Sequence, residues 1–199
     1  MYIVRNFYRD RPGYRCLQEA VRANYLKHYD ATPEPRPDVF VCLTKGDGAA
    51  PGFACVGITY GDSGKLFSEY YLEEPLDRTY AIDRARIVEV GAFASFHSGS
   101  GAGRYLLKTV VKTLALHNYG LMVLTATEQV RQILGHIVTN LDDLGDAQVS
   151  RVKDPHVNWG SYYAHAPRVV ASRLTSPGAW AHKPCTLVRP KTFALPASA

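Results

Sequence analysis

The feature that most constrains this chain is a strand–turn–helix–strand unit between residues 86 and 127. The residues RIVEVGAFAS at positions 86–95 predict a strand, and the glycine-rich turn SGSGAG at 98–103 opens a helix. The apolar face of that helix consists of Leu107, Val110, Val111 and Leu114. Gly120 ends it, and LMVLTAT at 121–127 predicts a buried strand. Strands that alternate with a helix in this way indicate an α/β fold.

The rest of the chain supplies further strands and helices. Apolar spacing predicts a helix over residues 14–29, followed by an extended connector that contains Pro33, Pro35 and Pro37. Beyond the connector we expect a hairpin of strands at 39–44 and 53–61, a short helix or irregular segment at 66–77, a helix at 129–138, a loop with up to one helical turn at 140–157, and one or two strands within 159–174. Residues 1–175 are therefore interpreted as a single domain, and residues 176–199 as a Pro-rich C-terminal tail.

Composition limits the class of protein without choosing a partner. With 199 residues, 46% of them apolar, the chain can bury one sizeable core. A net charge of +5 suits phosphorylated cofactors, acidic carrier proteins, nucleic acid and anionic membranes equally well. The four cysteines and seven histidines lack metal-ligand spacing, so no metal is expected. We find neither a secretory signal nor an integral membrane segment, which predicts a cytoplasmic protein.

The glycine-rich turn is the first candidate binding site. Such a turn at a helix start leaves backbone N–H groups free, and the helix dipole favours an anion there, so a pyrophosphate would fit. The alternative is a merely flexible turn. The turn resembles motif A of the GNAT superfamily of N-acyltransferases, in which Q/R-x-x-G-x-G/A binds the pyrophosphate of coenzyme A. Ser98, Gly101 and Gly103 take the three pattern positions, although Ser98 departs from the usual Gln or Arg.

This resemblance implies a set of residues that would hold the acyl donor. The pyrophosphate contacts are Ser98, Gly99, Gly101, Ala102, Gly103 and Arg104, and the strand backbone at Gly91, Ala92 and Phe93 would polarise the thioester carbonyl. Arg104, Lys108 and Lys112 form a basic stripe along the following helix. The stripe suits coenzyme A phosphates or an acidic acyl carrier protein, whereas an ordinary solvated face explains Lys108 and Lys112 equally well.

Glu89 is the first catalytic candidate, because it interrupts an apolar strand between Val88 and Val90. A carboxylate there is costly unless it is paired or faces a cleft, and partial burial would raise its pKa toward the range of a general base. The competing interpretation is a structural ion pair with Arg84, Arg86 or Arg104.

Aromatic residues provide the remaining candidates. Tyr162 or Tyr163 would protonate a leaving thiolate, and strand alternation predicts that one faces the cleft while the other packs in the core. Core packing is the alternative for each of them. Glu69, Tyr70 and Trp159 are candidate contacts to the acceptor.

A more particular resemblance covers roughly residues 20–174. The segments LFSEYYLEEPLD, RIVEVGAFAS, LMVLTAT and WGSYYAHAPRV follow the order and spacing of the thermostable hemolysin family, a bacterial group in the GNAT-like clan. The central strand is also distantly similar to the E-x-S-R-F segment of acyl-homoserine-lactone synthases, with Gly91 and Ala92 in place of its Ser-Arg. Both resemblances imply a mixed central sheet, splayed at the donor site and flanked by helices.

Together these features predict an acyltransferase that moves an acyl group from acyl-CoA or acyl-phosphopantetheine to a small amine acceptor, without nucleic acid as a partner. Two alternatives belong to other classes. One is a membrane-active, hemolysin-like protein, and the other is a non-catalytic module of the same fold that binds coenzyme A or a carrier protein.

Overall fold

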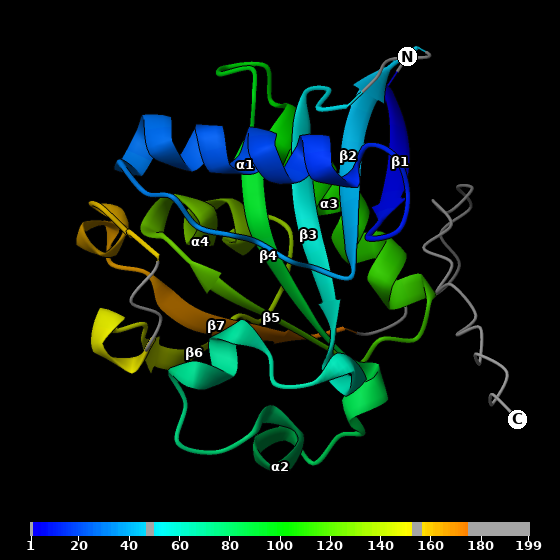
Figure 1. Ribbon diagram of the computed structural model, residues 1–199. Helices are drawn as coiled ribbons and strands as arrows, with labels where there is room; N and C mark the ends of the chain where they lie inside the picture. The colour runs from blue at the N-terminus through cyan, green and yellow to red at the C-terminus, as the bar shows by residue number, and fades with distance from the viewer. Residues whose placement is uncertain (1, 47–49, 153–156, 175–199) are drawn as a thin grey trace, which may run out of the picture.

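The computed structural model describes residues 2–46, 50–152 and 157–174, so the predicted tail lies outside the described residues. The described strands form a single sheet with helices on both faces (Figure 1). The strands are β1 (Tyr2–Tyr8), β2 (Val39–Lys45), β3 (Ala54–Tyr60), β4 (Ile87–Ser95), β5 (Leu121–Ala126), β6 (Asp142–Asp146) and β7 (Arg168–Arg173). The α-helices are α1 (Tyr14–Tyr29), α2 (Leu76–Tyr80), α3 (Ala102–Leu116) and α4 (Glu128–Gly135). The 3-10 helices are η1 (Gly61–Ser63), η2 (Phe67–Tyr70), η3 (Arg84–Arg86), η4 (Val149–Arg151) and η5 (Tyr162–His165).

The sheet is mixed, as the sequence predicts. Its strand order is β1-β2-β3-β4-β5-β7-β6, and every neighbouring pair is antiparallel except β4 and β5. A parallel pair needs a crossover connection, and α3 provides it between these two strands. The predicted hairpin is confirmed as the β2–β3 pair.

The two faces of the sheet are covered differently (Figure 1). One face packs against α3 and α4 in a large apolar cluster that includes Val88 and Val90 of β4. On the opposite face, α1 covers β2, β3 and the end of β4, while η2 and α2 cover β5 and β7. Alternation along β4 places Glu89 on this second face, at the boundary between the two coverings.

The sheet opens in the middle of β4. Residue pairing between β4 and β5 ends at Glu89 and Val123, although β4 continues to Ser95 and β5 to Ala126. A β-bulge follows, because two residues of β4, Ala92 and Phe93, lie opposite one residue of β3, and Ala92 has a φ of 46°. The bulge bends β4 away from β5, which produces the predicted splay.

The structure corrects several sequence-based predictions. β6 occupies part of the segment predicted as a loop, and β1 was not predicted at all. β6 reads DDLGD, a composition with low β propensity, and it pairs because Arg168 of β7 bonds Asp143 and Asp146. Within 159–174 one strand forms, and residues 162–165 are helical. Helix α4 ends at Gly135, three residues earlier than predicted.

Helix α3 provides a test of the apolar cluster that it forms with the sheet. Leu106 is fully buried in the cluster beneath the sheet, whereas Leu116 on the same helix is 39% exposed. We expect Leu106→Ala to lower the free energy of unfolding by about 2–5 kcal/mol, because it leaves a cavity among packed side chains. Leu116→Ala is the matched control and should change it by less than about 1 kcal/mol. Urea titrations followed by circular dichroism measure both, and equal losses would contradict the packing described here.

Candidate active site

Glu89 lies where β4 and β5 separate, and its carboxylate accepts three hydrogen bonds. The side chain is buried, and Oε2 accepts a hydrogen bond from the Phe67 amide at 2.8 Å. Oε1 accepts from the Ser68 amide at 2.7 Å and from Ser68 Oγ at 2.5 Å. Among the described residues Glu89 forms no ion pair, so the alternative of a pair with Arg84, Arg86 or Arg104 is wrong.

The environment raises the pKa of Glu89. Burial is the main cause, since it penalises the charged carboxylate. The hydrogen bonds from Ser68 and Phe67 oppose this shift without cancelling it. A carboxylate with a raised pKa is a better proton acceptor than an exposed one, which is the property required of a general base.

A chain of hydroxyls connects the two strands across the opening. Ser68 Oγ lies 3.0 Å from Oγ1 of Thr125, a residue of β5. The Tyr162 hydroxyl in turn donates to the Thr125 carbonyl at 3.4 Å. Ser68 and Thr125 were not predicted from the sequence, because nothing in the local pattern distinguishes them from other strand and turn hydroxyls.

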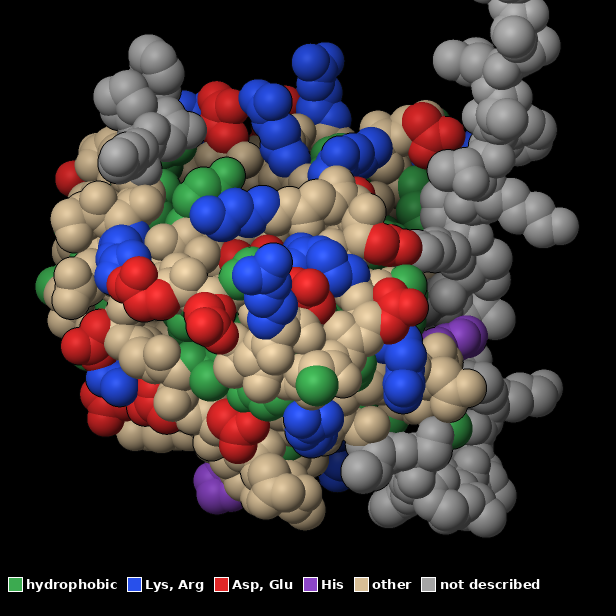
Figure 2. All heavy atoms as spheres, turned by 90° about the horizontal axis from the view of Figure 1, so that it is seen from below, with side chains coloured by type: hydrophobic (Ala, Val, Ile, Leu, Met, Phe, Trp, Pro, Cys, Tyr) green, Lys and Arg blue, Asp and Glu red, His purple; other side chains and the backbone are tan. Residues whose placement is uncertain are grey.

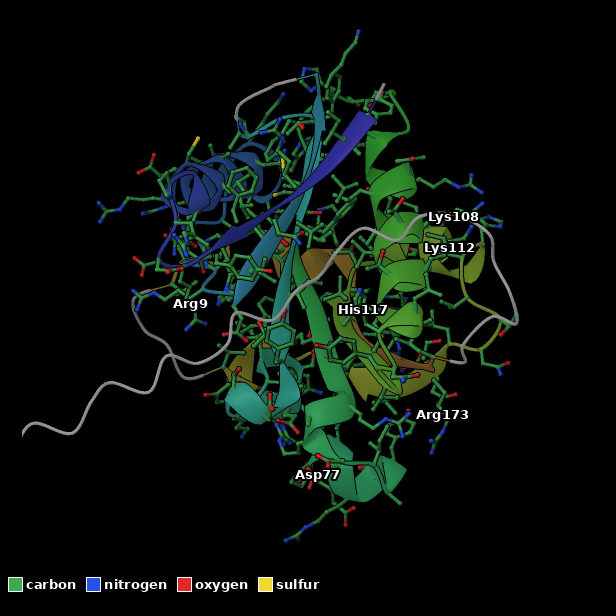
Figure 3. The ribbon with its side chains drawn as sticks, turned by 90° about the vertical axis from the view of Figure 1, so that its right-hand side faces the viewer. Arg9, Asp77, Lys108, Lys112, His117 and Arg173 are labelled. Atoms are coloured by element: carbon green, nitrogen blue, oxygen red, sulfur yellow. The ribbon has the colours of Figure 1, made fainter. Side chains whose placement is uncertain are left out.

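Glu69 fixes the turn that carries the Ser68 and Phe67 amides. Its carboxylate accepts from the amides of Leu66 at 2.9 Å and Leu76 at 3.1 Å, and from Arg84 Nη1 at 2.8 Å and Nη2 at 3.0 Å. Burial raises the pKa of Glu69, but these donors outweigh it and hold the pKa below the usual value. Arg84 also bonds Asp77 at 3.0 Å, a residue of α2, and Figure 3 shows Asp77 at the bottom of the view.

Glu69 was predicted as an acceptor contact, and the structure gives its carboxylate other partners. Its oxygens are already used by the turn and by Arg84, and it does not line the cavity described next. Glu69 instead positions the donors that hold Glu89.

A cavity of about 590 Å³ opens beside Glu89 on the α1 face of the sheet. Its floor includes Glu89, Gly91, Ala92 and Thr125, from the two separated strands. Its walls include Tyr70, Trp159 and Tyr162, three residues predicted from the sequence to contact substrate or donate a proton. The volume is in the range of small-molecule sites.

The tyrosine pair divides as predicted, but for a different reason. Tyr162 and Tyr163 belong to a 3-10 helix, so strand alternation does not apply to them. Tyr162 is buried and lines the cavity, whereas the Tyr163 hydroxyl lies 2.7 Å from that of Tyr71 and does not. Burial raises the pKa of both phenols, which keeps them protonated near neutral pH.

The glycine-rich turn lies at the end of β4 and not among the cavity residues. Gly99 and Gly101 have φ values of 75° and 70°, which suit glycine, and α3 begins directly after Gly101. The Ala102 amide donates internally to Ser100 Oγ at 3.3 Å. Those of Gly103 and Arg104 have no hydrogen-bond acceptor in the described parts of the chain. Two amides of the first turn therefore stay available to an anion.

Phe93 and Gly103 hold the turn against the strand. A Cβ at Gly103 would lie 2.7 Å from Phe93 Cζ, so a larger residue there would displace the Phe93 ring from its place between β4 and α3. Ser98, Gly99 and Gly101 are exposed, as is Arg104. Lys108 and Lys112 follow Arg104 along the helix surface, and Figure 3 shows them projecting from α3 away from the sheet.

Neither a membrane span nor a metal site is found in residues 2–46, 50–152 and 157–174. No helix there is long and apolar enough to cross a bilayer. No three acidic, histidine or cysteine side chains in these segments gather as metal ligands would.

Comparison with known sequences assigns the family. A sequence model described as "Thermostable hemolysin" matches residues 7–177, most of the chain. The chain belongs to the thermostable hemolysin family. The family resemblance read from the sequence is thus confirmed. A search of curated protein sequences found no match to this chain.

Solved structures identify the fold of this thermostable hemolysin family protein. The acyl-homoserine-lactone synthase LasI matches with a TM-score of 0.55 at 14% identity, over 88% of this chain and 91% of LasI. The ribosomal-protein-S18-alanine N-acetyltransferase of Escherichia coli matches with a TM-score of 0.52 at 9% identity, over 89% and 97%. Escherichia coli ElaA matches with a TM-score of 0.52 at 11% identity, over 86% and 99%. The fold is the predicted GNAT fold.

The hydrogen bond from Ser68 Oγ makes a direct prediction about Glu89. Removing this donor in Ser68→Ala takes away a contact that favours the charged carboxylate, so the pKa of Glu89 should rise further. Carbon-13 NMR titration of the glutamate carboxyls measures the shift. Ser100→Ala, which removes a hydroxyl in the glycine-rich turn, is the control and should leave the Glu89 titration unchanged. An unchanged titration in Ser68→Ala would refute the assigned contact.

Proposed function

We propose that this protein is an acyltransferase that moves an acyl group from acyl-CoA or acyl-phosphopantetheine on a carrier protein to a small amine. The observation that supports this most strongly is the position of Glu89. This buried carboxylate has a raised pKa and no cationic partner among the residues that the structure describes, and it lies at the floor of a cavity, where the central sheet separates. The solved structures that share this chain's fold include an N-acetyltransferase and an acyl-homoserine-lactone synthase, which is consistent with this class of reaction.

In the proposed mechanism the two sides of the splayed sheet have separate tasks. The free amides of Gly103 and Arg104, with the exposed turn Ser98–Ser100 and the Arg104 side chain, would bind the donor pyrophosphate. The unpaired edge of β4 near Gly91–Phe93 would polarise the thioester carbonyl. The bulge at Ala92 joins the two regions, so an acyl group placed there would face the cavity.

Proton transfer is assigned to residues of the cavity. Glu89 would accept the proton of the attacking amine, either directly or through the Thr125 and Ser68 hydroxyls. Tyr162 would donate the phenolic proton to the departing thiolate. We assign Tyr163 to packing, since its hydroxyl bonds Tyr71 outside the cavity.

The site of action and the carrier partner are also proposals. A cytoplasmic location would give access to coenzyme A thioesters. The exposed side chains of Arg104 and Lys108 suit an acidic carrier protein, because a basic surface attracts an acidic partner at long range. On the face seen in Figure 2, acidic and basic side chains are interspersed around α2, so the net charge of +5 is not gathered there.

Replacement of the general base is the main test of this function. Glu89→Gln should lower kcat by about two to four orders of magnitude, since the amide cannot accept the amine proton. Release of free thiol from acetyl-CoA and longer acyl-CoA thioesters, with a panel of primary amines, measures turnover. Glu73→Gln is the control, because Glu73 is exposed at the surface and bonded to Arg151. Full activity of a folded Glu89→Gln protein would exclude the proposed role.

The raised pKa of Glu89 predicts how kcat/KM falls at low pH. A general base works only when it is deprotonated, so kcat/KM should be high above the pKa of Glu89 and fall as pH drops through it. Because that pKa is raised, the fall should occur at a pH above the ordinary glutamate range. Ser68→Ala should move the fall to still higher pH. A flat profile between pH 4 and 8 would contradict the mechanism.

Donor binding is tested separately from chemistry. Arg104→Glu places a negative charge beside the two free amides, so the Kd for coenzyme A at low ionic strength should rise about tenfold or more. Isothermal titration calorimetry measures this Kd. Lys27→Glu, at the end of α1, introduces the same charge change elsewhere and should have little effect. Equal affinity in Arg104→Glu and the wild type would remove the turn from the donor site.

A further inference from the structure

The residues that line the cavity beside Glu89 indicate which kind of acceptor would fit there. We propose that the acceptor is a monoamine with an aromatic or similarly bulky apolar body, whose reacting nitrogen is its only positive charge. This proposal rests on the proposed transferase function and names the substrate class of the same site. It follows from the rings in the cavity wall and from the pairing of the charges around it.

Aromatic rings that already contact each other form much of the wall. Trp159 lies 5.7 Å from Phe67 and 5.6 Å from Tyr162, measured between ring centroids, and Tyr162 stacks on Tyr25 at 5.9 Å. All four residues line the cavity, as does Tyr70. Rings held by one another lose little freedom when a ligand binds, so they offer a preformed apolar surface. An aromatic ligand would gain both burial and ring contacts there.

Among the acidic side chains that line the cavity, one remains to bind a cation of the ligand. Asp38 is bound by Arg9 at 3.3 Å, and Glu34 is bound by Arg36 at 2.9 Å. Glu89 is the only acid of the lining without a cationic partner among the described residues. A single ammonium group on the acceptor would therefore pair with the Glu89 carboxylate. The aromatic faces beside it also favour a cation.

A second cationic group on the acceptor would meet positive charge instead. Lys65 lines the cavity, forms no ion pair in the described part of the chain, and sits over the Tyr70 ring at 4.4 Å from its centroid. Arg9 and Arg36 add two further cations, each already offset by its acid. A diamine or polyamine would have to bring its second charge toward Lys65 without a free carboxylate to receive it. The lining therefore favours a single amine on an apolar body.

The test compares two amines of similar length, 2-phenylethylamine and 1,5-diaminopentane. With acetyl-CoA and decanoyl-CoA as donors, kcat/KM measured by thiol release should be at least tenfold higher for 2-phenylethylamine. Binding without donor gives a second readout, because 2-phenylethylamine should shift the NMR signal of the Trp159 indole N–H, assigned with a Trp180→Phe variant. A preference for the diamine in either measurement, or no difference in both, would overturn the proposal.

The two readouts separate this inference from the function it rests on. If the aromatic amine binds at Trp159 but no thiol is released, the cavity takes the proposed class of ligand and acyl transfer from these two CoA thioesters fails. If both amines are acylated and the diamine is preferred, the transferase function stands and the acceptor class fails. If neither amine binds or reacts, the assignment of the cavity to an aromatic monoamine is wrong.

Matched variants locate the preference in the cavity wall. Tyr70→Ser removes a cavity ring that is 45% exposed, and it should raise the KM for 2-phenylethylamine roughly three- to tenfold. Tyr105→Ser removes a ring that is 51% exposed and outside the cavity, and it should not change this KM. Lys65→Glu should raise kcat/KM for 1,5-diaminopentane about tenfold, since it supplies the missing carboxylate. Equal effects of the two tyrosine variants would contradict the assigned wall.

Discussion

The structure depends on the place where β4 and β5 stop pairing. Up to Glu89 and Val123 the two strands share the parallel ladder, and beyond them the bulge at Ala92 turns β4 away. A sheet opened in its middle exposes backbone groups and apolar side chains that would otherwise be satisfied by the neighbouring strand. Covering elements on each face limit this cost: α3 and α4 on one side, and α1, η2 and α2 on the other.

The opening also explains the arrangement around Glu89. A buried carboxylate is costly without partners, and here the partners are two amides and a hydroxyl, not an arginine. Hydrogen bonds of this kind stabilise the charge less completely than a buried cation would, which leaves the pKa of Glu89 raised. The arginine of the region, Arg84, pairs instead with Glu69, the residue after Ser68, where it neutralises that carboxylate and fixes the turn. Glu89 and Glu69, two carboxylates that influence each other in space, thus have pKa values shifted in opposite directions by their surroundings.

Much of the fold could be predicted from the sequence because its central elements have strong local patterns. The bounds predicted for α1 are those observed, and the β4–α3–β5 unit has strict apolar spacing with a glycine on each side of the helix. The edge strands could not be predicted in this way. β6 contains three aspartates and a glycine in five residues, and it becomes a strand only because β7 offers a ladder and Arg168 pairs with its acids. The strand conformation of β6 therefore depends on its pairing with β7.

The sequence by itself determined which residue types could do chemistry: a carboxylate within an apolar strand, glycines before a helix, and aromatic residues near the end of the domain. It did not determine their partners. Tertiary structure decided that Glu89 has no cationic partner in the described parts of the chain while Glu69 is paired, and that Tyr162 enters the cavity while Tyr163 binds Tyr71. It also brought Ser68 next to Thr125, 57 positions away. Burial and hydrogen-bond partners come from segments distant in the chain, so no local pattern can specify them.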